Sequence, residues 1–336
     1  MSKLSKATKA TSGVSDNARH GNNTGNNGND GTDYGVPALE QAYGKGVARA
    51  AARARAKKLG LTSEGRQPGW PSYLILVVTI LIFVFPLYYA VSIASQNSPS
   101  NQYGVRALIP GSALLANIGR AFDAIDFWQA LGGTFFVATL VSVSTVLFST
   151  LAGYSFAKLH FRGRSFLLTF VVATMTIPQQ LSVVPLYIMA NKAGLYGNLW
   201  AVIIPGLVSA FGVFWMTQYI SDALPYELIE AARVDGCSMI RTFWSVALPA
   251  ARPAASMLFL FTFIGQWTNY FWPMLVLGSN KNSMLTVAAA ALKGAYFTDY
   301  TMVMSGVILT TFPLILLFFF AGRQLVSGIM AGAVKG

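Results

Sequence analysis

The sequence predicts an all-α integral membrane protein with six transmembrane helices. The chain has 336 residues, of which 54% are hydrophobic and only 11% are charged, and its mean hydropathy is +0.51. Soluble domains carry more than twice this share of charge, and a soluble fold of this length could not bury so much apolar surface. Six apolar runs, each near the ~20 residues that cross the hydrocarbon core of a bilayer, lie at Tyr73–Ala94, Leu131–Gly153, Phe166–Met189, Leu199–Ile220, Ala255–Leu277 and Met302–Gly322.

The segment before the first run has two parts. Residues 1–36 are rich in Gly, Asn, Ser and Thr and are predicted to be disordered, because they bury too little to offset the entropy of ordering. Residues 37–69 are predicted to form a basic cytoplasmic helix and linker, either on anionic lipid headgroups or in solvent. Neither part contains the apolar core of a signal peptide, so the first run is predicted to be an uncleaved anchor.

Basic residues predict the orientation of the chain. Eleven of the 24 Lys and Arg residues precede Trp70. With the N-terminus inside, 19 of the 24 fall in inside segments and five in outside segments, as the positive-inside rule requires. We therefore expect both termini in the cytoplasm, a cytoplasmic tail at 326–336 and a five-helix core at 131–325.

Two of the three connections predicted to lie outside are long. Residues 70–130 would comprise the first transmembrane helix and a long extracytoplasmic loop, and Gly278–Thr301 would form a second outside loop with an Ala-rich turn at Ala288–Leu292. The polar segment 221–252 falls on the cytoplasmic side.

The segment 221–252 contains residues that favour the starts and ends of two short helices. Pro225 suits the first turn of a helix, and Glu227 and Glu230 favour its N-terminal half. Gly236 is placed to end that helix, because glycine tolerates a positive φ. Ser238 is a candidate cap for a second helix ending near Pro249. Four residues are expected to share one face of the first helix: Leu228, Ala231, Ala232 and Asp235.

This segment resembles the EAA loop of permease subunits of binding-protein-dependent ABC importers. The family pattern is E-A-A, three residues, G, nine residues, then I-x-L-P. Here it is matched by Glu230-Ala231-Ala232, Gly236 and Leu248-Pro249, with Val246 in place of the usual Ile. Further segments are similar to sugar permeases of the maltose-transporter second-subunit type, and this similarity covers residues 72–336: Ala152–Lys158, Phe161–Gly163, Met175–Pro178, Val184–Tyr187 and Ala193–Tyr196.

The resemblance implies a MetI-like ABC importer permease fold in the cytoplasmic membrane of a prokaryote. It implies a homologous second permease, two ATP-binding subunits and an extracytoplasmic solute-binding protein as partners. ATP and Mg would be bound by the partner ATPase, with no cofactor or metal in this chain and no nucleic-acid partner. The residues implied to couple to the ATPase are Glu230, Ala231, Ala232, Asp235, Gly236, Leu248 and Pro249.

Polar residues inside two apolar runs are candidates for a substrate pathway. Amides and aromatic rings suit sugars, which present hydroxyl groups and flat apolar faces. The alternative is that the amides form hydrogen bonds between helices and that the aromatic residues anchor the helices at the membrane interface. The candidates are Gln179, Gln180 and Ser182 in the third run, and Gln266, Asn269 and Tyr270 in the fifth.

Motifs that the sequence lacks exclude several classes of function. It has no G-x-x-x-x-G-K-[ST] phosphate-binding loop and almost no ionisable residue within its spans. The single Cys237 permits no intramolecular disulfide, and His20 and His160 lack metal-ligand spacing. The predicted function is a permease subunit of an ATP-driven importer of a di- or oligosaccharide. The alternatives are the same machine for a non-sugar solute, an ATP-independent secondary carrier, or a membrane-embedded enzyme.

Overall fold

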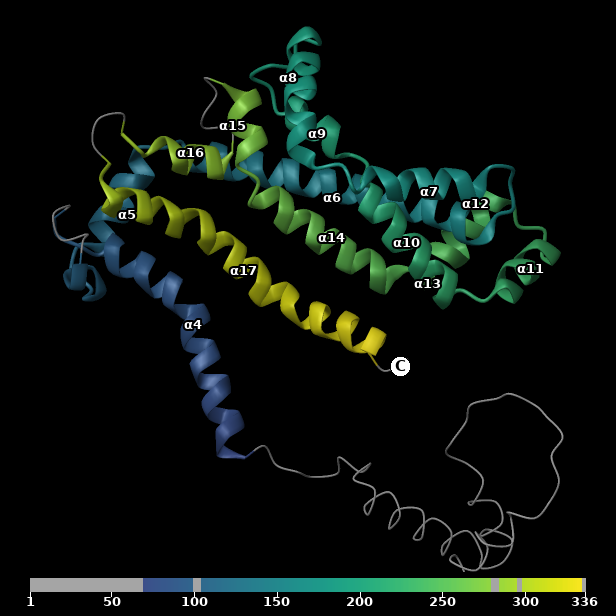
Figure 1. Cartoon of the computed structure of the whole chain (residues 1–336), viewed down its shortest axis with the longest axis horizontal. Helices are drawn as coiled ribbons and strands as arrows, with labels where there is room; N and C mark the ends of the chain where they lie inside the picture. The colour runs from purple at the N-terminus through teal and green to yellow at the C-terminus, as the bar shows by residue number, and fades with distance from the viewer. Residues whose placement is uncertain (1–68, 99–103, 279–283, 295–297, 334–336) are drawn as a thin grey trace, which may run out of the picture. The chain divides into compact units, whose positions relative to one another are not determined.

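The computed structural model describes residues 69–98, 104–278, 284–294 and 298–333, with side chains as far as Phe319 (Figure 1). Every regular element in these ranges is helical. The chain divides into two compact units, Met1–Thr79 and Ile80–Gly336, and of the first only residues 69–79 are described. The predictions for the segments 1–36 and 37–69 lie, except for Gly69, outside the described residues.

The first predicted span is confirmed as α4, Trp70–Ala94. Its 25 residues give a length of about 37 Å, enough to cross the hydrocarbon core. All of its side chains from Trp70 to Tyr88 are exposed, and nearly all are apolar. A helix that is apolar on every side is suited to lipid rather than to water.

The central element of the second unit is α6, Phe127–Lys158, which contains the second predicted span. It packs against α10, Ala210–Ala223, and against α14, Arg252–Trp267. Glycines bring α6 and α10 together: a Cβ on Gly153 would lie 2.8 Å from the carbonyl carbon of Met216, and one on Gly212 would lie 2.4 Å from Ser149 Oγ. Such small-residue contacts let helix backbones approach closely.

The third predicted span is not one straight helix. The structure has α7 at Arg164–Thr174, a 3₁₀ turn η3 at Gln179–Ser182, and α8 at Val183–Lys192, with a 90° bend across the break. Pro178 stands in the break. It has no N–H to donate and disfavours helical φ and ψ at the residue before it. The prediction of a continuous helix over Phe166–Met189 is therefore wrong.

The fourth predicted span is broken less sharply. It consists of α9, Trp200–Gly206, and α10, separated by Leu207–Ser209. Ser209 caps α10 by accepting a hydrogen bond from Gly212 N–H at 3.2 Å. Together α9 and α10 are long enough to cross a membrane.

The fifth predicted span, Ala255–Leu277, is also not one helix. Its first part belongs to α14, whose 16 residues extend about 24 Å. A break at Thr268–Tyr270 separates α14 from α15, Phe271–Leu277. Four helices of the described residues are long and apolar enough to span a membrane, and two bent pairs raise that number to six at most.

One end of the second unit carries short helices between the spans. They are η2, Gly104–Leu108, α5, Leu114–Asp123, and α16, Leu285–Ala291. The Ala-rich segment predicted as a turn is thus mostly helix α16. It forms because Leu285 and Ala288 are buried there, and because Thr134 Oγ1 on α6 accepts a hydrogen bond from Leu285 N–H at 2.8 Å.

The sixth predicted span is confirmed within α17, Tyr300–Ala333, which continues through most of the predicted tail at 326–336. A chain of polar contacts fixes its start. Asn117 Nδ2 donates to the carbonyls of Ala94 and Gln96 at 2.8 and 2.9 Å. Arg120 donates to Asn117 Oδ1 at 3.2 Å and to Asp299 Oδ2 at 2.9 Å. The contacts therefore join the C-terminal end of α4, helix α5 and the N-terminus of α17.

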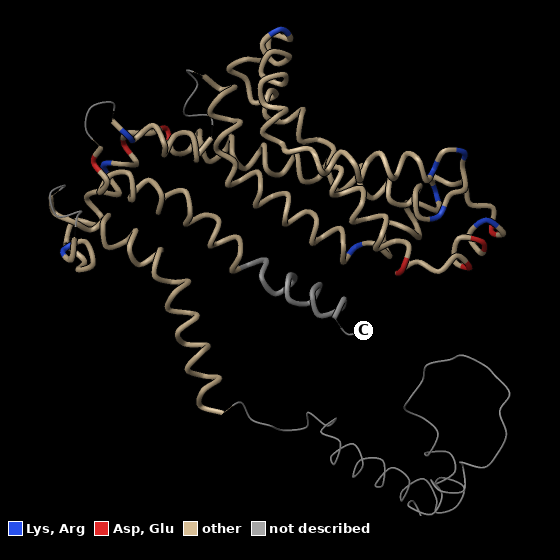
Figure 2. The backbone as a smooth tube through the Cα atoms, viewed as in Figure 1, with Lys and Arg blue, Asp and Glu red and all other residues tan. Residues whose placement is uncertain are grey.

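Charged residues gather at the ends of the helices, with an uncharged stretch between (Figure 2). One group lies where α6 ends and around α11 (Tyr226–Val234), and another lies around α5 and the start of α17. Lys192 is in the last turn of α8. This distribution is the one expected of helices that cross a hydrocarbon layer.

Candidate functional site

The segment 221–252, which we call the EAA loop, forms two short helices around a glycine turn. Helix α11, Tyr226–Val234, follows Pro225 as predicted. Gly236 has φ +76°, its N–H donates to Arg233 O at 3.0 Å, and Cys237 N–H donates to Ala232 O at 2.9 Å. This pair of bonds is a Schellman motif, which ends a helix at a left-handed residue. The predicted helix stop at Gly236 is confirmed.

The second helix of the EAA loop begins at the predicted cap. Ser238 Oγ accepts the N–H of Arg241 at 3.3 Å. The chain then runs through α12 (Met239–Thr242), a π-helical turn η4 (Phe243–Ala247) and α13 (Leu248–Ala250). The helix therefore ends close to Pro249, as the sequence predicts, and α14 starts at Arg252 after a 77° bend.

The predicted coupling residues of the EAA loop differ in exposure. Glu230, Ala231, Asp235 and Gly236 are exposed, whereas Ala232 is buried. Leu248 and Pro249 are half-buried in α13. Ala232 therefore faces the chain's own core, together with Ile229, and does not share an outer face with Ala231. The tip also exposes apolar side chains among these charged ones, since Val234 is 87% exposed and Ile240 72% exposed.

The base of the EAA loop is a buried core shared with α6 and α10. Tyr154 on α6 lies against Phe243 of η4, with ring centroids 5.9 Å apart. Met216, Ile220 and Ile229 belong to the same cluster. The two short helices are therefore fixed to the membrane helices by packing at their base, while their tip is exposed.

The pathway candidates of the third predicted span lie on η3. Gln179, Gln180 and Ser182 are all exposed. They occupy the bend between α7 and α8, where the backbone leaves the helical path. Irregular backbone at membrane depth occurs where it is covered by protein or lines a water-filled cavity.

Gln266 on α14 is near the break between α9 and α10. A Cβ on Gly206 would be 3.4 Å from Gln266 Nε2, and Gln266 Oε1 is buried and accepts no hydrogen bond from a described residue. The carbonyls freed at this break are bonded by α6, because Thr145 Oγ1 donates to Gly206 O at 3.1 Å and Ser144 Oγ donates to Leu207 O at 3.0 Å.

The α6 hydroxyls at this break were missed by the sequence analysis. The signal that could have found them is the pair of adjacent hydroxyl residues Ser144 and Thr145 in an otherwise apolar helix.

Asn269 and Tyr270 occupy the break between α14 and α15. Thr286 Oγ1 donates to the carbonyl of Asn269 at 2.7 Å, and Tyr270 is exposed. Two nearby tryptophans join helices: Trp267 Nε1 donates to Thr310 O at 3.2 Å and Trp272 Nε1 to Ala201 O at 3.1 Å. Pro205 has no N–H for the Ala201 carbonyl, so Trp272 replaces the missing helical bond.

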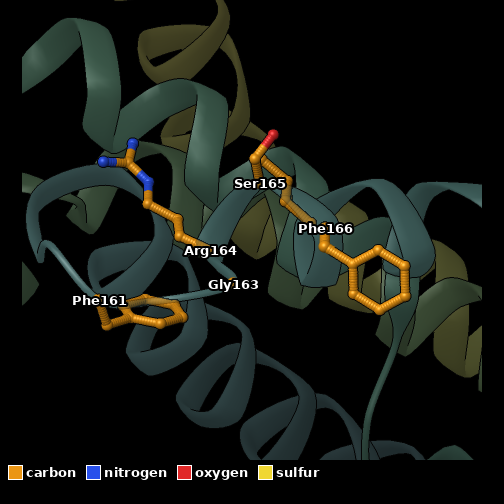
Figure 3. A pocket seen from close by; sticks show the side chains of 6 residues that line it. Phe161, Gly163, Arg164, Ser165 and Phe166 are labelled. Carbon is orange, nitrogen blue, oxygen red and sulfur yellow. The ribbon is translucent and has the colours of Figure 1, made fainter.

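The two groups of pathway candidates are not linked by hydrogen bonds among the described residues, since none joins η3 to Gln266, Asn269 or Tyr270. An open hollow lies elsewhere, at the turn from α6 to α7 (Figure 3). It is lined by Phe161, Gly163, Arg164, Ser165, Phe166 and Leu168, none of which is a pathway candidate.

Comparisons with known proteins agree with this geometry. Residues 146–330 match the model of the binding-protein-dependent transport system inner membrane component family. The lactose transport system permease protein LacG of Rhizobium radiobacter is 33% identical over 278 residues, which cover 82% of this chain and 99% of that protein. The arabinooligosaccharides transport system permease protein AraQ of Halalkalibacterium halodurans is 31% identical, covering 76% of this chain and 92% of AraQ.

More distant similarities extend the comparison. The sn-glycerol-3-phosphate transport system permease protein UgpE of Yersinia pestis is 27% identical, over 77% of this chain and 94% of UgpE. A crystal structure of a bacterial ABC transporter involved in the import of the acidic polysaccharide alginate has the same fold, with a TM-score of 0.64 and 23% identity over 76% of this chain and 95% of that one. The chain is thus a multi-pass membrane protein that belongs to the binding-protein-dependent transport system inner membrane component family of ABC importer permeases.

Proposed function

We propose that this permease moves a di- or oligosaccharide into the cell, using energy from separate ATP-hydrolysing subunits that dock on the EAA loop. The EAA loop carries the proposal: a rigid base, a Schellman turn at Gly236 and an exposed tip of small and apolar residues. An exposed apolar patch rimmed by charge is typical of a protein–protein interface. On α11 that rim includes Glu230 and Arg233.

The choice of a sugar rests on relatives and on chemistry. Relatives above 30% identity are named for lactose and for arabinooligosaccharides. The unbonded oxygen of Gln266 offers an acceptor for a hydroxyl, and the exposed ring of Tyr270 offers an apolar face. A homologous second permease would complete the pathway, since no hydrogen bond among the described residues joins η3 to the candidates on and after α14. The similarity to UgpE, which is named for sn-glycerol-3-phosphate, makes a phosphorylated polyol the alternative substrate.

The proposed orientation has both termini and the EAA loop in the cytoplasm. The basic cluster at the end of α6 and start of α7 then faces the cytoplasm, in agreement with the positive-inside rule. The end that carries α5 and α16 would face the solute-binding protein.

A docking test follows from the exposure of Ala231. The tagged chain is purified in mild detergent from its native cell, as wild type and as Ala231→Trp, and its partners are identified by mass. Because Ala231 is exposed, the larger side chain leaves the fold and the second permease in place but blocks the ATP-binding subunit. We expect recovery of that subunit to fall at least tenfold. Ala291→Trp, at an exposed alanine that ends α16, is the matched control.

Equal recovery of the ATP-binding subunit with Ala231→Trp would show that the EAA loop is not its docking site. The wild-type complex is then placed in proteoliposomes and offered labelled lactose, an arabino-oligosaccharide and sn-glycerol-3-phosphate. Uptake of only the third would favour the non-sugar alternative. Uptake by the chain without ATP-binding subunits would favour a secondary carrier.

A further inference from the structure

The last residue of α6 and the segment just after it make polar contacts with both sides of the α10–α11 junction. Lys158, the last residue of α6, donates from Nζ to the carbonyl of Ser221 at 3.0 Å, in the last turn of α10. Two residues further on, His160 Nδ1 and Tyr226 Oη share a hydrogen bond of 3.3 Å, and their rings meet edge to face. Tyr226 is the first residue of α11.

Lys158 is an unusual residue for such a position. It is only 7% exposed, and burial of a charged ammonium group costs free energy unless the group is paired and bonded. The carboxylates of Asp222 and Glu227 attract its charge. The last carbonyls of a helix also favour a cation, because they lack partners and carry the negative end of the helix dipole. A residue needed only to fill space there would not require a charge.

The second helix of the EAA loop also packs against α6. Tyr154, one turn before Lys158, is buried against Phe243 of η4. Helix α6 and the two residues after it therefore contact the end of α10, the start of α11 and the π-helical turn η4. The polar contacts come from Lys158, which bonds α10, and from His160, which bonds α11.

We propose that Lys158, together with the His160–Tyr226 contact, is a positioning element that makes α6 follow the movement of α11. The inference rests on the proposed function, in which the ATP-binding subunits dock on the EAA loop, and it adds that α11 moves with them. Lys158 touches neither nucleotide nor solute. It holds the end of α10 against α6, so that displacement of α11 displaces α6 as well.

The test uses the complete complex in proteoliposomes and a reporter at the far end of α6. Gln129, exposed near the start of α6, is replaced by Gln129→Cys in a Cys237→Ser background. A membrane-impermeant maleimide labels the new thiol, and mass spectrometry measures labelling of this chain with and without ATP and vanadate. Trapped nucleotide is measured in parallel. This readout does not depend on which solute is carried.

We expect trapping to change the labelling rate in the otherwise unaltered complex, and Lys158→Met to reduce that change about tenfold while nucleotide is still trapped. Tenfold corresponds to about 1.4 kcal/mol, near the lower end for a hydrogen bond from a charged donor. Lys158→Arg keeps a charged donor and should restore the response. Lys192→Met, at an exposed lysine in the last turn of α8, should leave it unchanged.

A full response in Lys158→Met, or no response in the otherwise unaltered complex despite trapped nucleotide, would overturn the inference. If Lys158→Met fails to assemble, Tyr226→Phe decides: it must reduce the response, and an unchanged response overturns the inference. An unaltered complex that traps no nucleotide would overturn the proposed function itself, and the inference with it.

Discussion

Asp299 is expected to hold the start of α17 by two separable interactions. Its Oδ1 accepts the N–H groups of Thr301 and Met302 at 3.0 and 3.3 Å, as an N-cap does. Its Oδ2 accepts the Arg120 guanidinium at 2.9 Å. Loss of such a cap costs about 1 kcal/mol. The ion pair contributes about 0.5 kcal/mol, because the Arg120 side chain is 53% exposed.

Asp299→Ala removes both interactions and should lower the free energy of unfolding by about 1.5 kcal/mol. Asp299→Asn keeps a capping oxygen and should cost about 0.5 kcal/mol, the ion pair alone. The assay is thermal unfolding of the purified chain in detergent, followed by tryptophan fluorescence, with Arg120→Gln as a third variant. Equal losses in Asp299→Ala and Asp299→Asn would refute the capping role, and a loss in Arg120→Gln larger than that in Asp299→Asn would refute the pairing.

The same carboxyl predicts a pH dependence. Burial alone would raise the pKa of Asp299, but hydrogen bonds from Thr301, Arg120 and Met302 and the Arg120 charge hold it below its ordinary value. The folded pKa is therefore lower than the unfolded value of about 3.9. The stabilisation is complete above the unfolded pKa and is lost as the pH falls through the folded pKa. The difference between wild type and Asp299→Asn should be constant from about pH 5 to pH 8 and should shrink below about pH 4.

Three further substitutions have defined outcomes. Gly153→Leu forces α6 and α10 apart and should lower the free energy of unfolding by about 1–3 kcal/mol, measured by thermal unfolding. Gly132→Leu is the control and should have little effect, because an added Cβ there meets nothing within 4 Å. Equal losses in the two variants would contradict the close packing. Gly236→Pro should abolish uptake in proteoliposomes while the complex still assembles. Gly194, like Gly236, has a positive φ, and Gly194→Pro is the control that should preserve uptake. Unchanged uptake in Gly236→Pro would refute the coupling role. Trp272→Phe leaves a carbonyl of α9 unbonded and should lower stability by about 1–3 kcal/mol, and an unchanged melting temperature would show that this carbonyl finds another donor.

Local signals in the sequence were sufficient for the EAA loop. Pro225, Gly236 and Ser238 act through their own backbone geometry or a bond three residues away, so helix starts and stops could be placed without tertiary information. Helix α4 could be predicted equally well, because a continuous apolar run is recognised in the sequence without knowledge of its contacts.

The breaks within the spans were less accessible. Hydropathy measures apolarity along the chain and does not detect a change of direction, so the bend at Pro178 was absorbed into one span. The break at Thr268–Tyr270 has no proline and is held by Thr286, which is distant in sequence. Helix α16 is too short to be stable alone and depends on its contact with Thr134.

The burial of Ala232 shows the same limit within the site. Its spacing from Leu228 and Asp235 suggested a shared outer face, but which face of a short helix turns inward is decided by the core beneath it, here by Ile229 and Phe243. Likewise, Lys158 seemed in sequence to be one more inside cation, and only its contact with Ser221 distinguishes it.

The unbroken length of α6 has a mechanical consequence. Its 32 residues form a rod of about 48 Å, whereas α7–α8, α9–α10 and α14–α15 are interrupted. A rod of that length amplifies rotation: a tilt of about 5° about one end moves the other end sideways by about 4 Å. That is comparable to the thickness of an aromatic ring. Under the proposed coupling, a small tilt of α6 would be enough to widen or narrow a passage beside it, without any bending of the helix.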